Sequence, residues 1–271
     1  TCSVLNVPFK MGEFRKALKK CKNTSPGKDR LSYIMFKHMS AHSQEIVLKY
    51  YNRIWEKGYI PKIWRHALVI PVLKPNKPKS DPASYRPIAL TSNFCKLMEK
   101  MIVNRMNWFL EKYNLLNNFQ SGFRKSRNTI DQLLRFSDTI LKSLGNKSFV
   151  LAVFFDLEKA YDMVWRKAVL YKLHKLGFDG NLFNWISAFL ENRSFQVSIG
   201  TSTSDTFDLE NGLPQGSVIS PILFLIAIND LSPTNVQFSL FADDTAVWKC
   251  GRNLQFLEKQ VQHAVDYIQD W

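Results

Sequence analysis

Three aspartates interrupt or end apolar runs of the chain, where carboxylates can hold metal ions. Asp156 ends an apolar run that begins at Phe149, and Asp243 and Asp244 interrupt a second run. Mg²⁺ prefers hard oxygen ligands, and two ions about 4 Å apart can stabilise the attacking and leaving oxygens of a phosphoryl transfer. The three aspartates are therefore candidate catalytic ligands for two Mg²⁺ ions, with Mn²⁺ as an alternative. An isolated Asp-Asp pair more often supplies only turn residues.

Two neighbouring strands would be needed to bring these aspartates together. The run at 149–155 is short, continuous and apolar, which predicts a strand buried on both faces. Residues 238–242 and 245–248 predict a hairpin with the acids at its tip. If the first strand and the hairpin are adjacent, a strand spacing of about 4.8 Å puts Asp156 and Asp243 within reach of the same ions.

Hydrophobic periodicity predicts the surrounding elements. Helical spacing favours helices at 11–21, 47–55, 97–109, 130–144, 164–176, 182–190, 217–230 and 254–268, and strand patterns occur at 67–73, 195–199 and 206–209. Residues 74–86 predict an irregular basic loop, because Pro75, Pro78 and Pro82 each remove a backbone donor. No glycine or proline ends the last helical pattern before Trp271, so we expect the chain to stop within a helix.

The composition fits a globular protein with a polyanionic partner. The chain has 271 residues, of which 45% are hydrophobic, enough for one large domain or two interleaved subdomains. Lysine and arginine total 37 against 23 aspartates and glutamates, which gives a formal net charge of +14. This charge favours a nucleic acid over a neutral metabolite, although a merely soluble basic protein would have the same composition.

Cysteine spacing and hydropathy restrict the class of protein further. The four cysteines lie far apart without a CxxC pair, which predicts neither a zinc site nor a disulfide framework; they are Cys2, Cys21, Cys95 and Cys250. No run approaches the roughly 18 apolar residues of a membrane span, and the N-terminus has no signal-peptide pattern. We therefore expect a soluble, intracellular protein in a reducing compartment, with no membrane partner.

Six segments of the chain, in a fixed order, resemble the motifs of one known family. Three look like the central palm motifs of reverse transcriptases, in the form found in non-LTR (LINE-type) retrotransposons: AVFFDLEKAYDMVW, NGLPQGSVISPILF and LFADDTAVW. Three upstream segments are similar to the fingers motifs of that group: SPGKDRL, YRPIALTSNFCKLMEKMI and QSGFRKSRNTIDQLL. One segment alone would be a weak signal, but six between Ser25 and Trp248 make the resemblance specific.

The resemblance implies a role for each aspartate and for one aromatic residue. It makes Asp156 and Asp243 metal ligands, with Asp244 beside them as a third catalytic carboxylate. Tyr161 falls where the family places an aromatic ring beneath the incoming sugar, and a ring there would collide with a ribose 2′-hydroxyl. Without the motif around it, Tyr161 would be an ordinary half-buried tyrosine.

The resemblance also implies contacts with the incoming nucleotide. Gln215 lies in a turn from which it can touch nucleotide or template, and Gly216 permits close approach of the backbone. Arg86 matches the fingers arginine that binds the triphosphate, and a guanidinium suits that bidentate contact. Lys74 is the preferred second phosphate contact, although other lysines share its loop and a solvated basic loop would have the same sequence. Those lysines are Lys77 and Lys79.

A template contact is implied for Arg124, with a surface arginine of no function as the alternative. The implied fold is α+β, a right-hand polymerase with an antiparallel palm sheet backed by helices. The fingers and an N-terminal extension would comprise residues 1–148 and the palm residues 149–271, with fingers segments interleaved. The implied function is RNA-directed DNA polymerisation, with an RNA template, a DNA primer and deoxynucleoside triphosphates as partners. The resemblance leaves the oligomeric state open and implies a nuclear or cytoplasmic ribonucleoprotein.

One departure from the family pattern lies after the Asp-Asp hairpin. The family continues there into a palm motif with an active-site lysine, a primer grip and a helical thumb, and these segments are absent from the sequence. We therefore expect this chain alone to be a weak or inactive polymerase. Two rival functions stay open: a nucleic-acid-binding module or decayed element copy without catalysis, and an RNA-dependent RNA polymerase, which Tyr161 disfavours.

Overall fold

The computed structural model describes residues 3–271, so Cys2 lies outside the described residues. The chain forms two compact units, and each combines two stretches of sequence. The first unit contains the residues up to Lys112 together with Tyr161–Leu223, and the second contains Tyr113–Ala160 and Phe224–Trp271. The boundary near Leu223 falls inside one helix, α10 (Ser220–Ala227).

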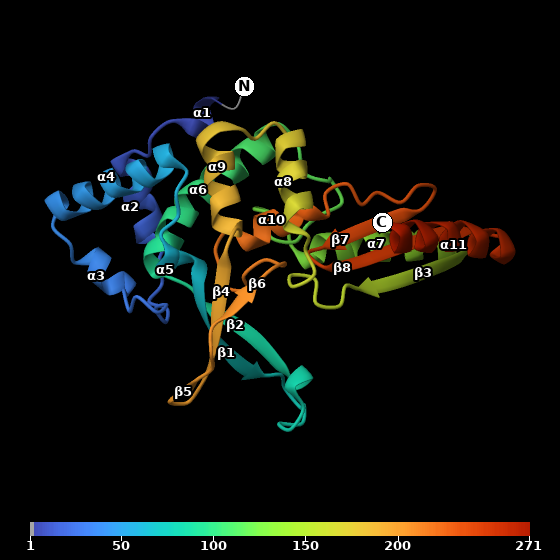
Figure 1. Cartoon of the computed structure of the whole chain (residues 1–271). Coiled ribbons are helices and arrows are strands. Elements are labelled where there is room, and N and C mark those ends of the chain that lie inside the picture. The colour runs from blue at the N-terminus through green and yellow to red at the C-terminus, as the bar shows by residue number, and fades with distance from the viewer. Residues whose placement is uncertain (1–2) are drawn as a thin grey trace. The chain divides into compact units, whose positions relative to one another are not determined.

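The first unit contains a mixed sheet and most of the helices (Figure 1). Its helical elements are α1 (Ser3–Asn6), α2 (Met11–Lys19), α3 (Tyr33–Lys37), α4 (Ala41–Lys57), α5 (Lys62–Arg65), the 3₁₀ turn η1 (Pro82–Ser84), α6 (Asn93–Lys112), α8 (Arg166–Lys175) and α9 (Gly180–Leu190). Its strands are β1 (His66–Leu73), β2 (Tyr85–Leu90), β4 (Arg193–Ile199), β5 (Ser202–Thr203) and β6 (Phe207–Leu209). The strand order is β2-β1-β4-β5, with β6 also paired to β4. The β1–β4 pair is parallel and the other pairs are antiparallel.

Helix α6 is the central helix of the first unit's core. Its apolar residues Leu97, Met98, Met101 and Ile102 are fully buried, and α2, whose Phe14 and Leu18 are also buried, packs against it. Each such side chain stabilises the fold by roughly 1.5–3 kcal/mol through removal from water. The basic residues of α2 are left on its exposed side, so the helix is amphipathic.

The second unit is a three-stranded antiparallel sheet with a helix on each face (Figure 1). Its elements are α7 (Thr129–Gly145), β3 (Phe149–Asp156), β7 (Gln237–Phe241), β8 (Asp244–Gly251) and α11 (Leu254–Asp270). The strand order is β3-β8-β7, so β8 is the central strand. The predicted adjacency of the first strand and the hairpin is therefore confirmed.

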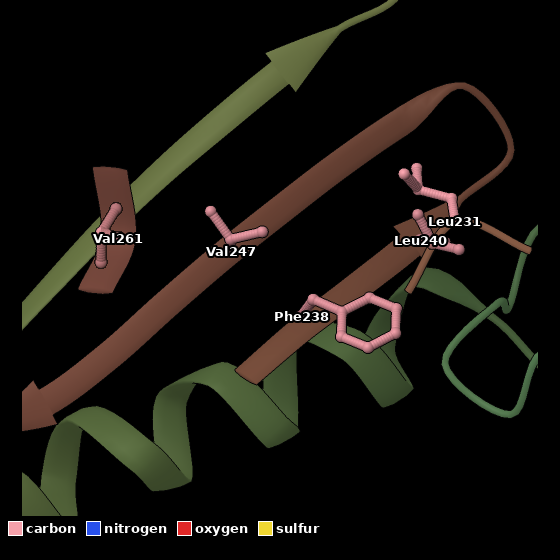
Figure 2. Close-up of a cluster of buried hydrophobic side chains, with 5 residues drawn as sticks. All are labelled: Leu231, Phe238, Leu240, Val247 and Val261. Atoms are coloured by element: carbon pink, nitrogen blue, oxygen red, sulfur yellow. The ribbon is translucent and has the colours of Figure 1, made fainter. Parts of the chain in front are cut away.

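Alternation along the strands directs their side chains to the two helices. Phe238, Leu240 and Val247 form one buried cluster with Val261 of α11 (Figure 2). On the other face, Phe136 of α7 packs against Phe154 and Trp248, with ring centroids 5.7 and 5.1 Å away. By the same alternation, Asp156 lies on the face of the sheet that carries Phe154.

Two predictions about local structure were wrong. The 149–156 segment is not buried on both faces, because β3 is an edge strand and the side chains of Phe149 and Phe154 are 55% and 68% exposed. The predicted 74–86 loop ends early, because Tyr85 and Arg86 pair with β1 as the first residues of β2. Pro87 is tolerated in β2 because this strand lies at an edge of its sheet.

The described residues form a mixed fold of helices and strands. Cys21, Cys95 and Cys250 are free thiols. Among residues 3–271, no helix is both long and apolar enough to cross a membrane.

Candidate active site

The ladder between β3 and β8 brings two of the candidate catalytic carboxylates together. Asp156, the last residue of β3, is the direct register partner of Asp244, the first residue of β8. Residues directly opposite in an antiparallel pair have Cβ atoms about 4.5–5.5 Å apart and share a face of the sheet. Asp243 precedes Asp244 in the two-residue turn between β7 and β8, so the three predicted carboxylates meet at one end of the sheet.

The carboxylates influence one another electrostatically. Burial, and then the nearby charges of Asp243 and Asp156, raise the pKa of Asp244 above its ordinary value. Within residues 3–271, the structure contains no cluster of three or more histidine, cysteine or acidic side chains positioned to hold a metal ion. The three side chains therefore lie near one another without converging on one point. A cation would relieve the repulsion that raises the pKa of Asp244.

The turn that carries Asp243 has an unusual backbone conformation. Ala242, the residue before Asp243, has a φ of 56°, in the left-handed region that favours glycine. A non-glycine residue in this region costs of order 1–3 kcal/mol, so surrounding contacts must hold it there. Gln120 supplies such contacts through its side chain.

In the first unit, two segments place Tyr161 beside Gln215. The N–H of Leu213 donates to the carbonyl oxygen of Tyr161 at 2.8 Å, and that of Gly212 to Val164 at 3.0 Å. The Gln215 side chain donates from Nε2 to Asp162 Oδ1 at 3.2 Å. The structure therefore brings together the predicted sugar contact and the predicted nucleotide contact.

The turn that contains Gln215 lies close against strand β2. The N–H of Ala89 donates to the Gln215 carbonyl oxygen at 2.8 Å. Gly216 has a φ of 111°, and a Cβ atom there would lie 2.6 Å from the Ala89 carbonyl oxygen. The predicted need for glycine at position 216 is thus confirmed, and the neighbour that requires it is β2.

A buried glutamate that the sequence reasoning missed fixes the other end of this turn. Glu99 of α6 is fully buried, and its Oε2 accepts hydrogen bonds from the N–H groups of Val218 and Ile219 at 2.6 and 3.1 Å. These two groups lie just before α10, so the carboxylate satisfies backbone donors in the segment that leads into that helix. Glu99 lies in the YRPIALTSNFCKLMEKMI segment, but only the fold shows which backbone groups it reaches.

The β1–β2 hairpin carries the two predicted phosphate contacts. Arg86 is exposed and pairs in register with Val72, while the backbone N–H of Lys74 donates to Ser84 at 2.8 Å and extends the ladder. This register puts Lys74 and Arg86 on the same face of the hairpin. Lys74 Nζ also donates to the carbonyl oxygen of Ala83 at 3.1 Å, which occupies part of its donor capacity.

A cavity of about 260 Å³ lies in the first unit between the sheet and the Gln215 turn. Its lining includes Asp162 and Gln215, together with Pro87 and Ala89 from the face of β2 that Arg86 does not share. Among the described residues, Lys74 and Arg86 are outside this lining. The structure therefore groups the predicted nucleotide contacts into two sets, one at the cavity and one on the hairpin.

The predicted template contact Arg124 is buried, with 7% of the residue exposed. Its Nη1 donates to the carbonyl oxygens of Asn117 and Gln120 at 2.9 and 3.4 Å. These bonds favour a role in holding the 117–124 segment in place. The contact with template stays a prediction.

Comparison with known proteins decides the family. The family model described as reverse transcriptase (RNA-dependent DNA polymerase) matches residues 75–271. The chain belongs to the reverse transcriptase family. The matched range of this reverse transcriptase chain includes the three carboxylates and Gln215, and the predicted resemblance is confirmed.

Three of the curated relatives of the reverse transcriptase chain illustrate the similarity, and all three come from mobile elements of Drosophila melanogaster. A probable RNA-directed DNA polymerase from transposon BS is 32% identical over 89% of this chain, and the RNA-directed DNA polymerase from mobile element jockey is 31% identical over 91% of it. A probable RNA-directed DNA polymerase from transposon X-element is 28% identical over 97%. The chain spans only 28% of the first two relatives and 29% of the third.

Proposed function

We propose that this chain supplies the polymerase core of an RNA-directed DNA polymerase of a non-LTR retrotransposon. The observation that carries the proposal is the register pair of Asp156 and Asp244, with Asp243 in the adjoining turn. Nucleotidyl transfer adds a deoxynucleotide to a primer 3′ end and releases pyrophosphate. The chain's membership of the reverse transcriptase family and the names of its relatives support this reaction.

The carboxylates suit the divalent ions that such a transfer uses. Asp156, Asp243 and Asp244 offer only oxygen donors, which are the ligands that Mg²⁺ and Mn²⁺ prefer. Burial, and then the negative charges of Asp243 and Asp156, raise the pKa of Asp244, and a bound cation would offset these charges. Two bound ions would supply charge stabilisation for the attacking and leaving oxygens. The donor chemistry of these residues therefore suits Mg²⁺, in the proposal two ions, with Mn²⁺ as an alternative.

The first unit supplies the proposed nucleotide contacts. Arg86 offers an exposed guanidinium for bidentate binding of a triphosphate, and Lys74 lies on the same face of the hairpin. Tyr161 is half-buried next to the Gln215 turn, and its ring would exclude a ribose 2′-hydroxyl by shape. Gln215 would contact the nucleotide or template. Arg124 is retained as a proposed template-side residue that acts through the loop it holds.

The finer architecture is part of the same proposal. The β3-β8-β7 sheet would belong to the palm at residues 149–271, and the β1–β2 hairpin to the fingers at 1–148. The partners would be an RNA template, a DNA primer and deoxynucleoside triphosphates, inside a nuclear or cytoplasmic ribonucleoprotein. The net charge of +14 supports a nucleic-acid partner.

Primer extension on an RNA template tests the proposal. The chain, or a longer polypeptide that contains it, is mixed with a labelled DNA primer annealed to RNA, Mg²⁺ and either deoxy- or ribonucleoside triphosphates. We expect extension that requires the metal and deoxynucleotides. Extension with ribonucleotides alone would favour an RNA polymerase. Tight binding of the primer–template without extension would indicate a nucleic-acid-binding module and would exclude the proposed reaction.

A further inference from the structure

The side chain of Gln120 spans the backbone of the turn that carries Asp243. Its Oε1 accepts hydrogen bonds from the N–H groups of Ala242 and Gly122 at 3.0 and 2.7 Å, and its Nε2 donates to the Ala242 carbonyl oxygen at 3.3 Å. Gln120 is 2% exposed, so water does not compete for these bonds. The carboxamide thus engages both polar backbone groups of the one residue in this turn that has a left-handed conformation.

The backbone around Gln120 is fixed to the free edge of β7. The N–H of Leu240 donates to the Phe119 carbonyl oxygen at 3.0 Å, and that of Ser121 donates to the Leu240 carbonyl oxygen at 2.9 Å. Gln120 and Leu240 form an isolated parallel bridge, so the segment around Gln120 is bonded to the outer edge of the three-stranded sheet. The glutamine therefore reaches the turn from a rigid support.

Glycine is required next to this support. A Cβ atom at Gly122 would lie 2.2 Å from the backbone nitrogen of Ala242, closer than real Cβ contacts allow. The absence of a side chain at position 122 lets the segment approach the turn, and Gln120 then bonds to it. Both residues lie in the QSGFR stretch, which its sequence marks only as part of a fingers motif.

We propose that Gln120 is the positioning residue of the Asp243–Asp244 turn, and this inference rests on the proposed function. By holding Ala242 at its positive φ, the carboxamide sets the direction in which Asp243 leaves the turn and the start of β8 at Asp244. Gln120 itself touches no metal or substrate. Loss of its bonds would let the turn relax, and the two aspartates would no longer offer their oxygens to the same ions.

Mn²⁺ binding by the whole chain tests this inference without relying on catalysis. Free Mn²⁺ is measured by electron paramagnetic resonance for the wild-type chain and for Gln120→Met, which keeps the side-chain length but removes the three bonds. Residues that orient metal ligands through hydrogen bonds typically change the metal affinity by about 10–100-fold when they are replaced. We expect Gln120→Met to lose Mn²⁺ affinity in that range. Where the polypeptide extends primers, we expect a lower kcat and a higher half-saturating Mg²⁺, with an unchanged affinity for primer–template.

Two further variants distinguish positioning from general support. Gln132→Met removes bonds from the same segment, to the Phe119 carbonyl oxygen and to Ser121 Oγ at 3.1 and 2.5 Å, but leaves the turn untouched. We expect it to bind Mn²⁺ like the wild type. Glycine accepts a positive φ without strain. Gln120→Met should therefore lower the Mn²⁺ affinity less when it is combined with Ala242→Gly, compared with Ala242→Gly alone, than it does in the wild-type chain.

The outcomes separate this inference from the proposed function. Wild-type Mn²⁺ affinity in Gln120→Met, or an equal loss in Gln132→Met, would overturn the positioning role even if the wild type extends primers. If the wild type binds no Mn²⁺, the metal assignment fails. Amide hydrogen exchange then tests whether Gln120 holds the turn through its hydrogen bond to Ala242. The Ala242 amide should then be as protected as that of Leu240, and free exchange would overturn the inference. If Gln120→Met does not fold, the same hydrogen-exchange measurement on the wild type tests the inference in its place.

Discussion

Asp156 and Asp244 are direct partners across the ladder of β3 and β8, although they are distant in the sequence. Strand pairing alone therefore brings two acidic groups to one end of a sheet, next to Asp243. Nothing in sheet stability favours like charges opposite each other, since such pairs are destabilising. Their arrangement is consistent with a site built to hold cations.

Divalent ions should stabilise the second unit through this pair. A ligand that binds only the folded state raises stability by mass action, so Mg²⁺ or Mn²⁺ should raise the melting temperature of the wild-type chain. Asp244→Asn removes one ligand and one repulsive charge. We expect it to melt at or slightly above the wild-type temperature without metal, and to lose most of the metal-dependent increase. An increase as large as that of the wild type would contradict the role of Asp244.

Tyr161 should set the choice between deoxy- and ribonucleotides. Tyr161→Ala removes the ring that would meet a 2′-hydroxyl, so relative incorporation of ribonucleotides should rise by more than overall activity falls. Tyr161→Phe keeps the ring and should keep the wild-type discrimination. Competition between the two nucleotides in single-turnover extension measures the ratio. Unchanged discrimination in Tyr161→Ala would leave the residue a structural role only.

Glu99 should be needed for the stability of the first unit. Glu99→Leu leaves the half-buried N–H group of Val218 and the buried N–H group of Ile219 without their acceptor, and each unsatisfied buried donor costs about 1–3 kcal/mol. We expect the free energy of unfolding in urea to fall by roughly 2–5 kcal/mol. Glu99→Gln keeps an acceptor oxygen and should lose less, while the exposed Glu45→Gln should change stability by under about 0.5 kcal/mol. Equal changes in the free energy of unfolding for Glu99→Leu and Glu45→Gln would show that Glu99 does not stabilise the first unit.

The basic hairpin loop should contribute to nucleic-acid binding through phosphate contacts. The slope of log affinity against log salt is about −0.9 per phosphate neutralised on a duplex. Replacing the exposed Lys77 and Lys79 by glutamine should reduce the magnitude of the slope by about 0.9 for each phosphate that the loop no longer neutralises. The exposed pair Lys142 and Lys259 of the second unit serves as the matched control. Identical slopes in the two double variants would mean that the loop lysines serve solubility alone.

Local patterns in the sequence predicted the elements that carry the site. The hairpin with acids at its tip and the strand ending at Asp156 were evident from residue types and spacing, and the resemblance to a known family indicated the turn at Gly216. The strand at 149–156 was predicted correctly in position but not in burial. A continuous apolar run does not reveal whether a strand is central or at an edge, because that depends on partners far along the chain.

The supporting residues could not be predicted in the same way. Glu99 and Gln120 are polar residues in a helix and a loop, and their partners are distant in the sequence. The buried position of Arg124 depends in the same way on the fold of its loop. Motif similarity marks such residues as part of a segment, but only the folded chain shows which backbone groups they reach.

The rate of adding one deoxynucleotide to a DNA primer on an RNA template tests the central claim most directly. The comparison is between wild type, Asp243→Asn and Asp266→Asn, in which the replaced aspartate is an exposed residue of α11. Loss of a metal ligand removes several kcal/mol of transition-state stabilisation, so Asp243→Asn should be slower by roughly a thousandfold or more. It should still fold and bind the primer–template, and Asp266→Asn should react at the wild-type rate. An Asp243→Asn variant that extends the primer as fast as the wild type would contradict the account.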